Sequence, residues 1–243
     1  MKALKEKIKI LLKSVNLYYL KSYNVPRSTL LGIKKLPIKT VIDIGANTGQ
    51  FAKYIVSIFP EAKLFCFEPL PSAFMSLEKW AKESLNQVEL FNVALGDSKS
   101  KVTINFHEDH SASSSLLSTT KQNNVLYPQT TNQRKIDVEQ TTLDLALSNY
   151  LEDLKSGILI KMDVQGFEGN VIAGGTNIIP LASAVILEVS IEKLYEGQSS
   201  FLELLSEMNK LGFYYAGNLE QYYHQDDGRT LFLDAVFLRN EEE

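Results

Sequence analysis

Short hydrophobic runs along this chain alternate with stretches in which apolar residues recur at helical spacing. The apolar runs predict buried strands, at residues 40–44, 64–67, 88–93, 158–162, 184–187 and 231–238. The helical spacing predicts helices over residues 50–59, 72–85 and 201–211, the first ended by Pro60 and the last by Gly212. Strands that alternate with helices indicate an α/β fold, with helices on both faces of a sheet.

Two stretches break this alternation. Residues 102–106 alternate between apolar and polar positions, which predicts an added hairpin strand. Residues 107–134 are rich in Ser, Thr, Asn and Gln and have no clear period. An insert of this length in a compact domain is commonly a functional lid or a mobile loop. We therefore expect a domain over residues 39–243 that carries a small hairpin and a polar loop insert.

Residues 1–38 form a separate segment with a basic character. Their apolar residues fall on one face of a predicted helix, and the lysines fall on the other: Leu4, Ile8, Leu11, Leu12, Val15, Tyr18 and Tyr19 against Lys2, Lys5, Lys9 and Lys13. Two interpretations stay open for this amphipathic arm. It packs its apolar face on the domain, or it contacts an anionic lipid or glycan through residues 1–21.

The charge of the chain is divided unevenly, although the net charge is only −4. Residues 1–39 hold ten basic residues and one acid, whereas the other 204 residues hold 15 basic and 28 acidic residues. Cys66 is the only cysteine, so an internal disulfide and an oxidising compartment are not required. No apolar run approaches the ~18 residues of a membrane span. These features predict a cytoplasmic protein, with membrane association through the arm as an option.

Candidate chemistry follows the predicted strands, because ligands bind beyond the carboxyl ends of strands in α/β sheets. The segment Asp43-Ile44-Gly45-Ala46-Asn47-Thr48-Gly49 links the first strand to a helix, and Glu68 ends the second strand. A carboxylate at that place can accept both hydroxyls of a ribose. The D-x-G-x-N-x-G pattern differs from the G-x-G-x-x-G of dinucleotide sites. Asp43 would repel a pyrophosphate but suits a cationic amino-acid group, which favours S-adenosylmethionine (SAM) over NAD.

Several motifs in order resemble those of class I SAM-dependent methyltransferases, and more narrowly the FkbM family. They are VIDIGANTGQF, FCFEP, FNVALGD, SASSSL, IKMDVQGFEGNVIAG, ILEVS and LDAVFLR, from about residue 40 to residue 239. The resemblance implies a Rossmann-like fold. Its sheet would be mostly parallel and seven-stranded, with an antiparallel last strand. The family commonly has D-V-E-G where this chain has Asp163-Val164-Gln165-Gly166, so Gln165 removes a charge beside the site.

The resemblance also implies roles for individual residues. Those expected to bind SAM are Asp43, Gly45, Asn47 and Gly49 at the methionine end, Glu68 at the ribose, Asn92, Ala94 and Leu95 at the adenine, and also Ala46, Pro69, Ser115 and Asp163. Asp163 should also face the methyl-transfer site. The Ser-rich motif is expected to donate hydrogen bonds to the cofactor or the acceptor.

An alcohol acceptor must lose a proton during or after methyl transfer, so the site needs a base. Asp163 and Glu188 each end a central strand and can reach the same crevice. Of the three imidazoles, His110 beside the Ser-rich motif is the best candidate, whereas His107 and His224 are expected to be exposed loop residues. These considerations predict Asp163, His110 and Glu188 as catalytic residues.

We expect no metal, although a divalent cation held by Asp163, Glu188 and Asp234 is an alternative. Lys161 is expected to pair with Asp163 or Glu68, and Cys66 to be inert core.

The function predicted from the sequence is SAM-dependent methylation of a hydroxyl on a sugar, glycolipid or secondary metabolite. One alternative is a SAM-binding module without catalysis. Another is a nucleic-acid methyltransferase that uses the basic arm. The acidic domain would repel phosphates, so nucleic acid is not an expected partner. The expected partner is a hydroxylated small molecule or glycan.

Overall fold

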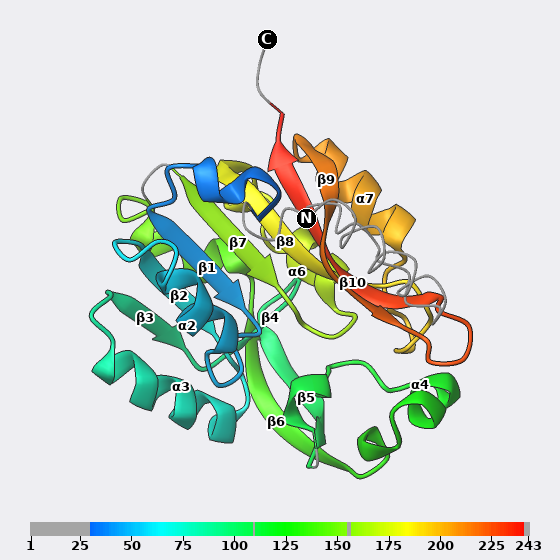
Figure 1. The fold of residues 1–243 in the computed structure, drawn as a ribbon. Helices are drawn as coiled ribbons and strands as arrows, with labels where there is room; N and C mark the ends of the chain where they lie inside the picture. Colours follow the sequence, from blue (N-terminus) through cyan, green and yellow to red (C-terminus); the bar gives the residue numbers. More distant parts are fainter. Residues whose placement is uncertain (1–29, 109, 155–156, 241–243) are drawn as a thin grey trace, which may run out of the picture.

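The computed structural model describes residues 30–108, 110–154 and 157–240. Its main feature is a seven-stranded sheet in the order β3-β2-β1-β7-β8-β10-β9 (Figure 1). The strands are β1 (Thr40–Ile44), β2 (Lys63–Phe67), β3 (Val88–Phe91), β7 (Ile158–Met162), β8 (Ala182–Ser190), β9 (Phe213–Tyr223) and β10 (Thr230–Arg239). All of them run in parallel except β10, which is antiparallel to β8 and β9. The predicted Rossmann-like α/β fold with an antiparallel last strand is confirmed.

Alternate strand residues bury two hydrophobic clusters, one on each face of the sheet. One face is covered by α2 (Gln50–Val56), α3 (Pro71–Glu83) and the 3-10 helix Leu30–Lys35. The other is covered by α5 (Leu143–Ala146), α6 (Glu168–Ala173) and α7 (Phe201–Lys210). In β1, for example, Val41 packs towards the first set of helices, and Ile42 and Ile44 pack towards the second. This alternation fixes which polar residues share a face at the strand ends.

The insert forms a second, three-stranded sheet beyond the carboxyl ends of β1 and β7 (Figure 1). Its order is β4-β6-β5, with β4 (Ala94–Leu95), β5 (Ser100–His107) and β6 (Gln133–Thr141). The predicted hairpin strand is β5, which pairs with β6 in antiparallel register from Ser100 to His107. The polar stretch between them contains α4 (Lys121–Leu126) and the 3-10 helices Ser111–Ser113 and Pro128–Thr130. Thr120 caps α4 by accepting a hydrogen bond from the Asn123 N–H.

The hydrophobic pattern did not predict strand β9. Only Phe213 is fully buried in this edge strand, and Tyr214, Tyr215, Tyr222 and Tyr223 are exposed, so it has no apolar run. Its pairing with β10 also contains three register shifts.

The predicted amphipathic helix lies in residues 1–29, outside the described residues. Leu30 and Ile33, which follow it, are buried against the domain. Within residues 30–108, 110–154 and 157–240, no helix is long and apolar enough to cross a membrane.

Candidate functional site

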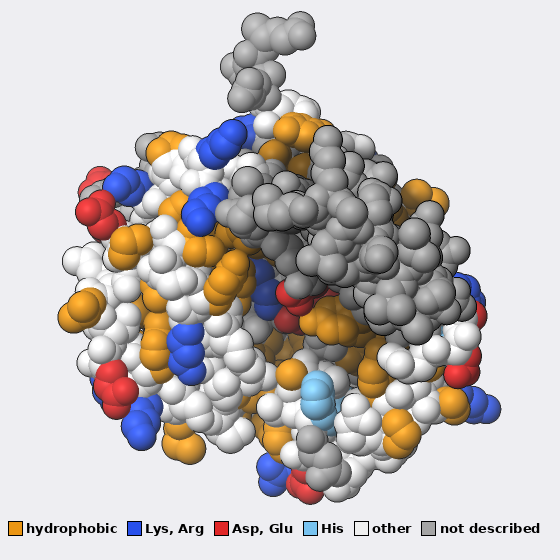
Figure 2. Space-filling model, viewed as in Figure 1, with side chains coloured by type: hydrophobic (Ala, Val, Ile, Leu, Met, Phe, Trp, Pro, Cys, Tyr) orange, Lys and Arg blue, Asp and Glu red, His pale blue; other side chains and the backbone are white. Residues whose placement is uncertain are grey.

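A cavity of about 470 Å³ lies where the carboxyl ends of the parallel strands meet the small sheet. The space-filling view shows this face hollowed near its centre, with basic and acidic side chains in the hollow and hydrophobic ones beside it (Figure 2). The lining comes from the β1–α2 loop, the ends of β2, β7 and β8, β4, the Ser-rich turn, β9 and β10. The cavity therefore lies at the carboxyl ends of the strands, where the sequence analysis expected the functional residues.

The period of two along each strand gathers the polar residues on one face. Asp43 lies opposite Lys161 in the pairing of β1 with β7, and Glu188 lies opposite Asp234 in the pairing of β8 with β10. Asp163 follows Lys161 by two positions, and Glu68 follows Cys66 by two. Because residues two apart point to the same side, these groups lie on the face that α2 covers.

The β1–α2 loop approaches the end of β7 at Gly45. Gly45 has a φ of +79°, and a Cβ built on it would lie 1.9 Å from the Asp163 carbonyl oxygen. Gly49 begins α2 with a φ of +85° and lies against α3, where its Cβ would be 3.0 Å from Leu77 and 3.5 Å from Trp80. Only glycine satisfies both the backbone conformation and the space at residue 45.

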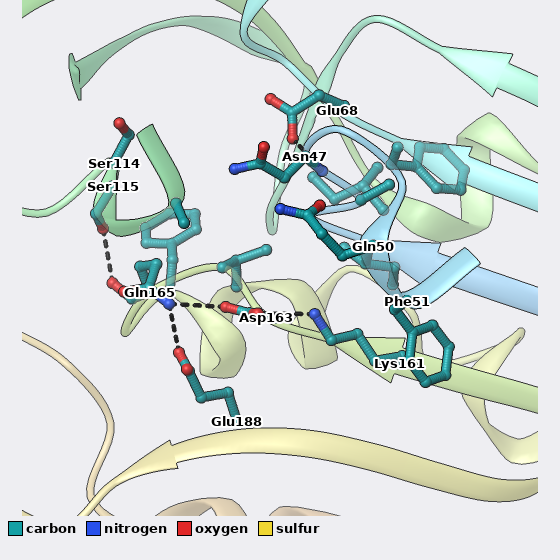
Figure 3. Close-up of a pocket in the computed structure, with 18 of the residues that line it drawn as sticks. Asn47, Gln50, Phe51, Glu68, Ser114, Ser115, Lys161, Asp163, Gln165 and Glu188 are labelled. Atoms are coloured by element: carbon teal, nitrogen blue, oxygen red, sulfur yellow. Dashed lines mark hydrogen bonds and ion pairs between the residues drawn. The ribbon is translucent and has the colours of Figure 1, made fainter. Parts of the chain in front are cut away.

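Glu68 lies beside this loop and is held by two backbone N–H groups. The N–H of Asn47 donates to its Oε2 at 2.8 Å, and the N–H of Leu70 donates to its Oε1 at 2.7 Å (Figure 3). Burial raises the pKa of the carboxyl group to about 7. Each oxygen keeps a second lone pair, so the fixed carboxylate can accept hydrogen bonds from a diol.

The adjoining wall is apolar. It consists of Val93, Ala94, Leu95, Ile104 and Leu116, from β4 and the residue before it, β5 and the segment after the Ser-rich turn. A flat base can be buried against such a wall, and Glu68 lines the same cavity, where its carboxylate can accept hydrogen bonds from a ribose. The combination of a fixed carboxylate and an apolar wall fits a nucleoside.

Lys161 and Asp163 form an ion pair in the lining, with the Nζ and Oδ2 atoms 2.7 Å apart. Burial alone would lower the pKa of Lys161, but the charges of Asp163 and Asp43 raise it. Burial alone would raise the pKa of Asp163, but the charge of Lys161 and hydrogen bonds lower it. Lys161 is therefore a fixed cation, and Asp163 is a fixed carboxylate at neutral pH. Of the two partners expected for Lys161, Asp163 and Glu68, the structure shows Asp163.

Gln165 joins Asp163 to Glu188. Its Nε2 donates to Asp163 Oδ1 at 2.7 Å and to Glu188 Oε2 at 2.5 Å (Figure 3). Tyr195 OH donates to the Oε1 of Gln165 at 2.7 Å, and Ser115 Oγ donates to its backbone oxygen at 2.7 Å. Both carboxylates that the sequence predicted as catalytic thus lie in one hydrogen-bonded group.

The structure brings ten of the predicted site residues into the lining: Gly45, Ala46, Asn47, Glu68, Pro69, Ala94, Leu95, Ser115, Asp163 and Glu188. Four others lie outside it. Asp43 is fully buried in the sheet, where burial raises its pKa to about 6, and Gly49 serves as the N-cap of α2. Asn92 donates to the backbone oxygens of Glu68 and Pro69, and His110 lies 2.8 Å from Ser113 Oγ on the surface.

His107 differs from the expectation of an exposed loop histidine. It ends strand β5 and is fully buried. Burial lowers the pKa of the imidazole, so His107 stays neutral. Ile104 and His107 are three positions apart in a strand that pairs with β6 without a register shift, so they point to opposite faces of the small sheet, and both are buried.

Several lining residues had no functional interpretation in the sequence. Gln50, Phe51 and Tyr54 share one face of α2, and their spacing after the glycine loop could have indicated this. Leu219, Glu220 and Tyr222 come from strand β9, which the sequence pattern did not predict. Nothing in the sequence therefore indicated that these residues line the cavity.

Asp234 lines the cavity opposite Glu188, although the two are far apart in sequence. Among the described residues, no three His, Cys, Asp or Glu side chains are grouped so that they could hold a metal ion.

Several known proteins to which this chain is similar are methyltransferases. Residues 43–215 match the methyltransferase FkbM domain. The 2-O-methyltransferase NoeI of Sinorhizobium fredii is 32% identical over 176 residues, which cover 70% of each chain. Methyltransferase sdnD of Sordaria araneosa is 28% identical over 155 residues, covering 55% of this chain and 59% of that one. The solved structure of the plantazolicin methyltransferase BamL, in complex with a triazolic desmethylPZN analog and SAH, has a TM-score of 0.49 at 13% identity, covering 98% of this chain and 91% of that one.

Proposed function

Because this chain belongs to the FkbM family of SAM-dependent methyltransferases, we propose that it transfers the methyl group to a hydroxyl oxygen of a sugar, glycolipid or secondary metabolite. One observation carries the choice of a hydroxyl. The cavity that fits a nucleoside on one side has the carboxylates Asp163 and Glu188 together on the other. The 2-O-methyltransferase activity named for NoeI supports the same choice.

The cofactor is S-adenosylmethionine, and the residues of the cavity fit it. Glu68, fixed by Asn47 and Leu70, would hold the ribose hydroxyls, and the apolar wall at Ala94 and Leu95 would bury the adenine. Asp163 supplies a negative charge for the cationic end. When bound, SAM supplies a methyl group that its sulfonium has already activated. The protein's tasks are then to align the acceptor, exclude water and receive a proton.

Glu188 is the group that would receive the proton of the acceptor hydroxyl. It lines the cavity, and burial and the charge of Asp163 raise its pKa well above the ordinary value for a glutamate. A carboxylate with a raised pKa is a stronger base at neutral pH, once it is ionised. His110 lies outside the lining, and we assign it no part in the reaction.

The remaining acceptor wall is polar and acidic. Glu220, Tyr222 and Asp234 extend it from Glu188 along β9 and β10. Such a wall offers hydrogen-bond acceptors to a molecule with several hydroxyls, and it repels phosphates. This favours a sugar-like acceptor over a nucleic acid.

The test is an acceptor screen with labelled SAM over free sugars, glycolipids and hydroxylated small molecules, with the methylated atom identified by mass spectrometry and NMR. We expect an O-methyl product. Glu188→Gln should lower turnover by about 10²–10⁴-fold, because it removes the general base, and should change the affinity for SAM little. Glu83→Gln, at an exposed position on α3, is the matched control and should keep full turnover.

Two results would contradict the proposal. One is full turnover by Glu188→Gln, and the other is a methyl group on nitrogen or carbon in the product. Tight SAM binding without transfer to any compound in the panel would favour a binding module without catalysis.

A further inference from the structure

The amide of Gln165 occupies a position that neither a carboxylate nor an apolar side chain could fill in the same way. The ionised carboxylate of Asp163 only accepts hydrogen bonds, so the atom that contacts both Asp163 and Glu188 must be the amide nitrogen with its two protons. The other amide atom, Oε1, accepts from Tyr195 OH. Every hydrogen-bonding group of this side chain is therefore used inside the protein.

The backbone around Gln165 is built to hold this orientation. Gln165 has a φ of +56°, which is unfavourable for a residue with a side chain. Ser115 Oγ fixes its carbonyl oxygen from the insert, and Gly166 lies so close to Tyr195 that a Cβ there would be 3.2 Å from it. Strain of this kind persists at sites where the surrounding structure requires one conformation.

Among the described residues that line the cavity, the charge around the two carboxylates is not balanced. Lys161 is the one cation of that lining, and it contacts Asp163. Glu188 instead faces the carboxylates of Glu168 and Asp234. The charge of Glu188 in turn raises the pKa values of the phenols of Tyr127, Tyr195 and Tyr222. The charge of Asp43 acts on Lys161, and that of Glu220 acts on Asp234. With one cation and two carboxylates joined through one amide, a single added proton neutralises the group.

We propose that Gln165 is a positioning residue: its amide joins Asp163 and Glu188 into a pair that holds one proton and releases it when a cationic methyl donor occupies the cavity. The proton leaves the carboxyl oxygen of Glu188 for the solvent, and the positive charge of the sulfonium takes its place. Glu188 is then an ionised base beside the acceptor. The inference rests on the proposed function, because it needs the sulfonium to lie next to the pair.

Further support comes from the directions in which the two carboxyl groups titrate. Burial and the charge of Asp163 raise the pKa of Glu188, whereas Lys161 and Gln165 lower that of Asp163 despite its burial, so Glu188 is the carboxyl group that holds the proton. A glutamate at position 165, as in the D-V-E-G pattern, would add a third carboxylate and would donate nothing to the other two unless it were itself protonated. The glutamine therefore sets the proton content of this site.

The experiment counts protons released on binding, using titration calorimetry in buffers of different ionisation enthalpy from about pH 5.5 to about pH 8.5. The probes are SAM, which carries a sulfonium, and S-adenosylhomocysteine, which has a neutral sulfur. We expect the wild-type chain to release more protons with SAM, with the excess approaching one where the pair is protonated. Glu188→Gln should abolish the excess.

Two substitutions test Gln165 itself. Gln165→Glu should raise the pH at which the excess is half-maximal by about one unit or more, because it adds a like charge. Gln165→Met removes both donors without adding charge and should raise it by less. Gln129→Glu adds the same charge at an exposed position and should leave it unchanged.

The outcomes separate the two proposals. If the wild-type chain binds neither probe, the proposed function is wrong. If it binds both, but the excess persists in Glu188→Gln or folded Gln165 variants keep the wild-type midpoint, the inference about Gln165 is overturned and the proposed function stands. Should Gln165→Glu fail to fold, Gln165→Met decides.

Discussion

Gly45 shows how a single residue can connect two halves of a site. Its missing side chain lets the loop that follows β1 lie against the Asp163 carbonyl at the end of β7. The loop that borders the cofactor side is therefore in direct contact with the backbone of Asp163, whose carboxylate lines the acceptor side. A change at residue 45 should displace both.

We expect Gly45→Ala to be strongly destabilising and to weaken SAM binding. The added Cβ would overlap a backbone oxygen, which only a shift of the loop or of β7 relieves, at a cost of about 1–3 kcal/mol beyond that of the positive φ. Chemical denaturation and calorimetry with SAM would measure both effects.

Gly197→Ala is the control for Gly45→Ala. Its φ is +80°, nearly the same as at Gly45, but nothing lies within 4 Å of the added Cβ. It should cost only the roughly 1–2 kcal/mol of the left-handed backbone. Equal losses in the two variants would show that the contact with Asp163 is unimportant.

At this scale the sequence was informative about types of residue and less so about contacts. The glycine loop, Glu68 and Asp163 follow strands, so their place could be predicted. Gln165 seemed to be a lost charge, since nothing in the linear order shows that its amide reaches Glu188, 23 positions further along. The same limit applies to Asp43, where the motif suggested a ligand contact and the pleat of β1 buries the side chain.

Among the elements, the inserted sheet is attached to the main sheet at the cavity. Tyr195 OH shares its proton between Gln165 Oε1 and the carbonyl oxygen of Ser113, which are 2.7 and 3.0 Å away. Ser115 makes a second connection to the same loop, through the backbone of Gln165. The Ser-rich turn thus closes one side of the cavity and is held in place there.

Tyr195→Phe should loosen this attachment. We expect a loss of about 1 kcal/mol in stability, from one buried hydrogen bond, and a larger fall in acceptor turnover than in SAM affinity. Tyr214→Phe, on the exposed part of β9, is the matched control and should change neither. Amide hydrogen exchange over residues 111–117 would report the loosening directly, and unchanged protection there would contradict the assignment.

Strands in the interior of the sheet were easier to predict from the hydrophobic pattern than the edge strand or the short helices of the insert. Buried parallel strands are mostly apolar, so β1, β2, β7 and β8 could be found even though Asp43, Lys161 and Glu188 lie within them. Strand β9 lies at the sheet edge and is exposed over most of its length, so its hydrophobic pattern is weak. The short helices of the insert have few apolar residues, and their stability comes from local caps such as Thr120.

Over the whole molecule, buried carboxyl groups concentrate around one cavity. The pKa values of Glu68 and Glu168 are raised to about 7, and that of Asp234 to about 6, in each case by burial first. In the unfolded chain these groups are ionised at neutral pH. The folded chain therefore binds more protons, and its free energy of unfolding must fall as the pH rises through these values.

Thermal unfolding without cofactor should show this fall between about pH 6.5 and about pH 8, by roughly 1 kcal/mol, or about 2–4 °C, for each group that titrates near pH 7. His107 acts in the opposite direction, because burial lowers its pKa in the folded chain while the unfolded imidazole still binds a proton near its ordinary value of 6.5. Glu68→Gln should make the stability depend less steeply on pH, by the contribution of one carboxyl group. Glu83→Gln should leave this pH dependence unchanged. A stability that rises over this range would contradict the assignment.

A last consequence concerns Trp80, which lies on α3 against Gly49 at the start of α2. It is the only tryptophan in the chain. Its indole ring also lies 6.0 Å from the ammonium of Lys53. The tryptophan fluorescence of the native protein therefore comes from one indole placed next to the cofactor loop. Ligand binding at that loop can be followed by emission from the unmodified chain, without a label and without knowledge of the acceptor.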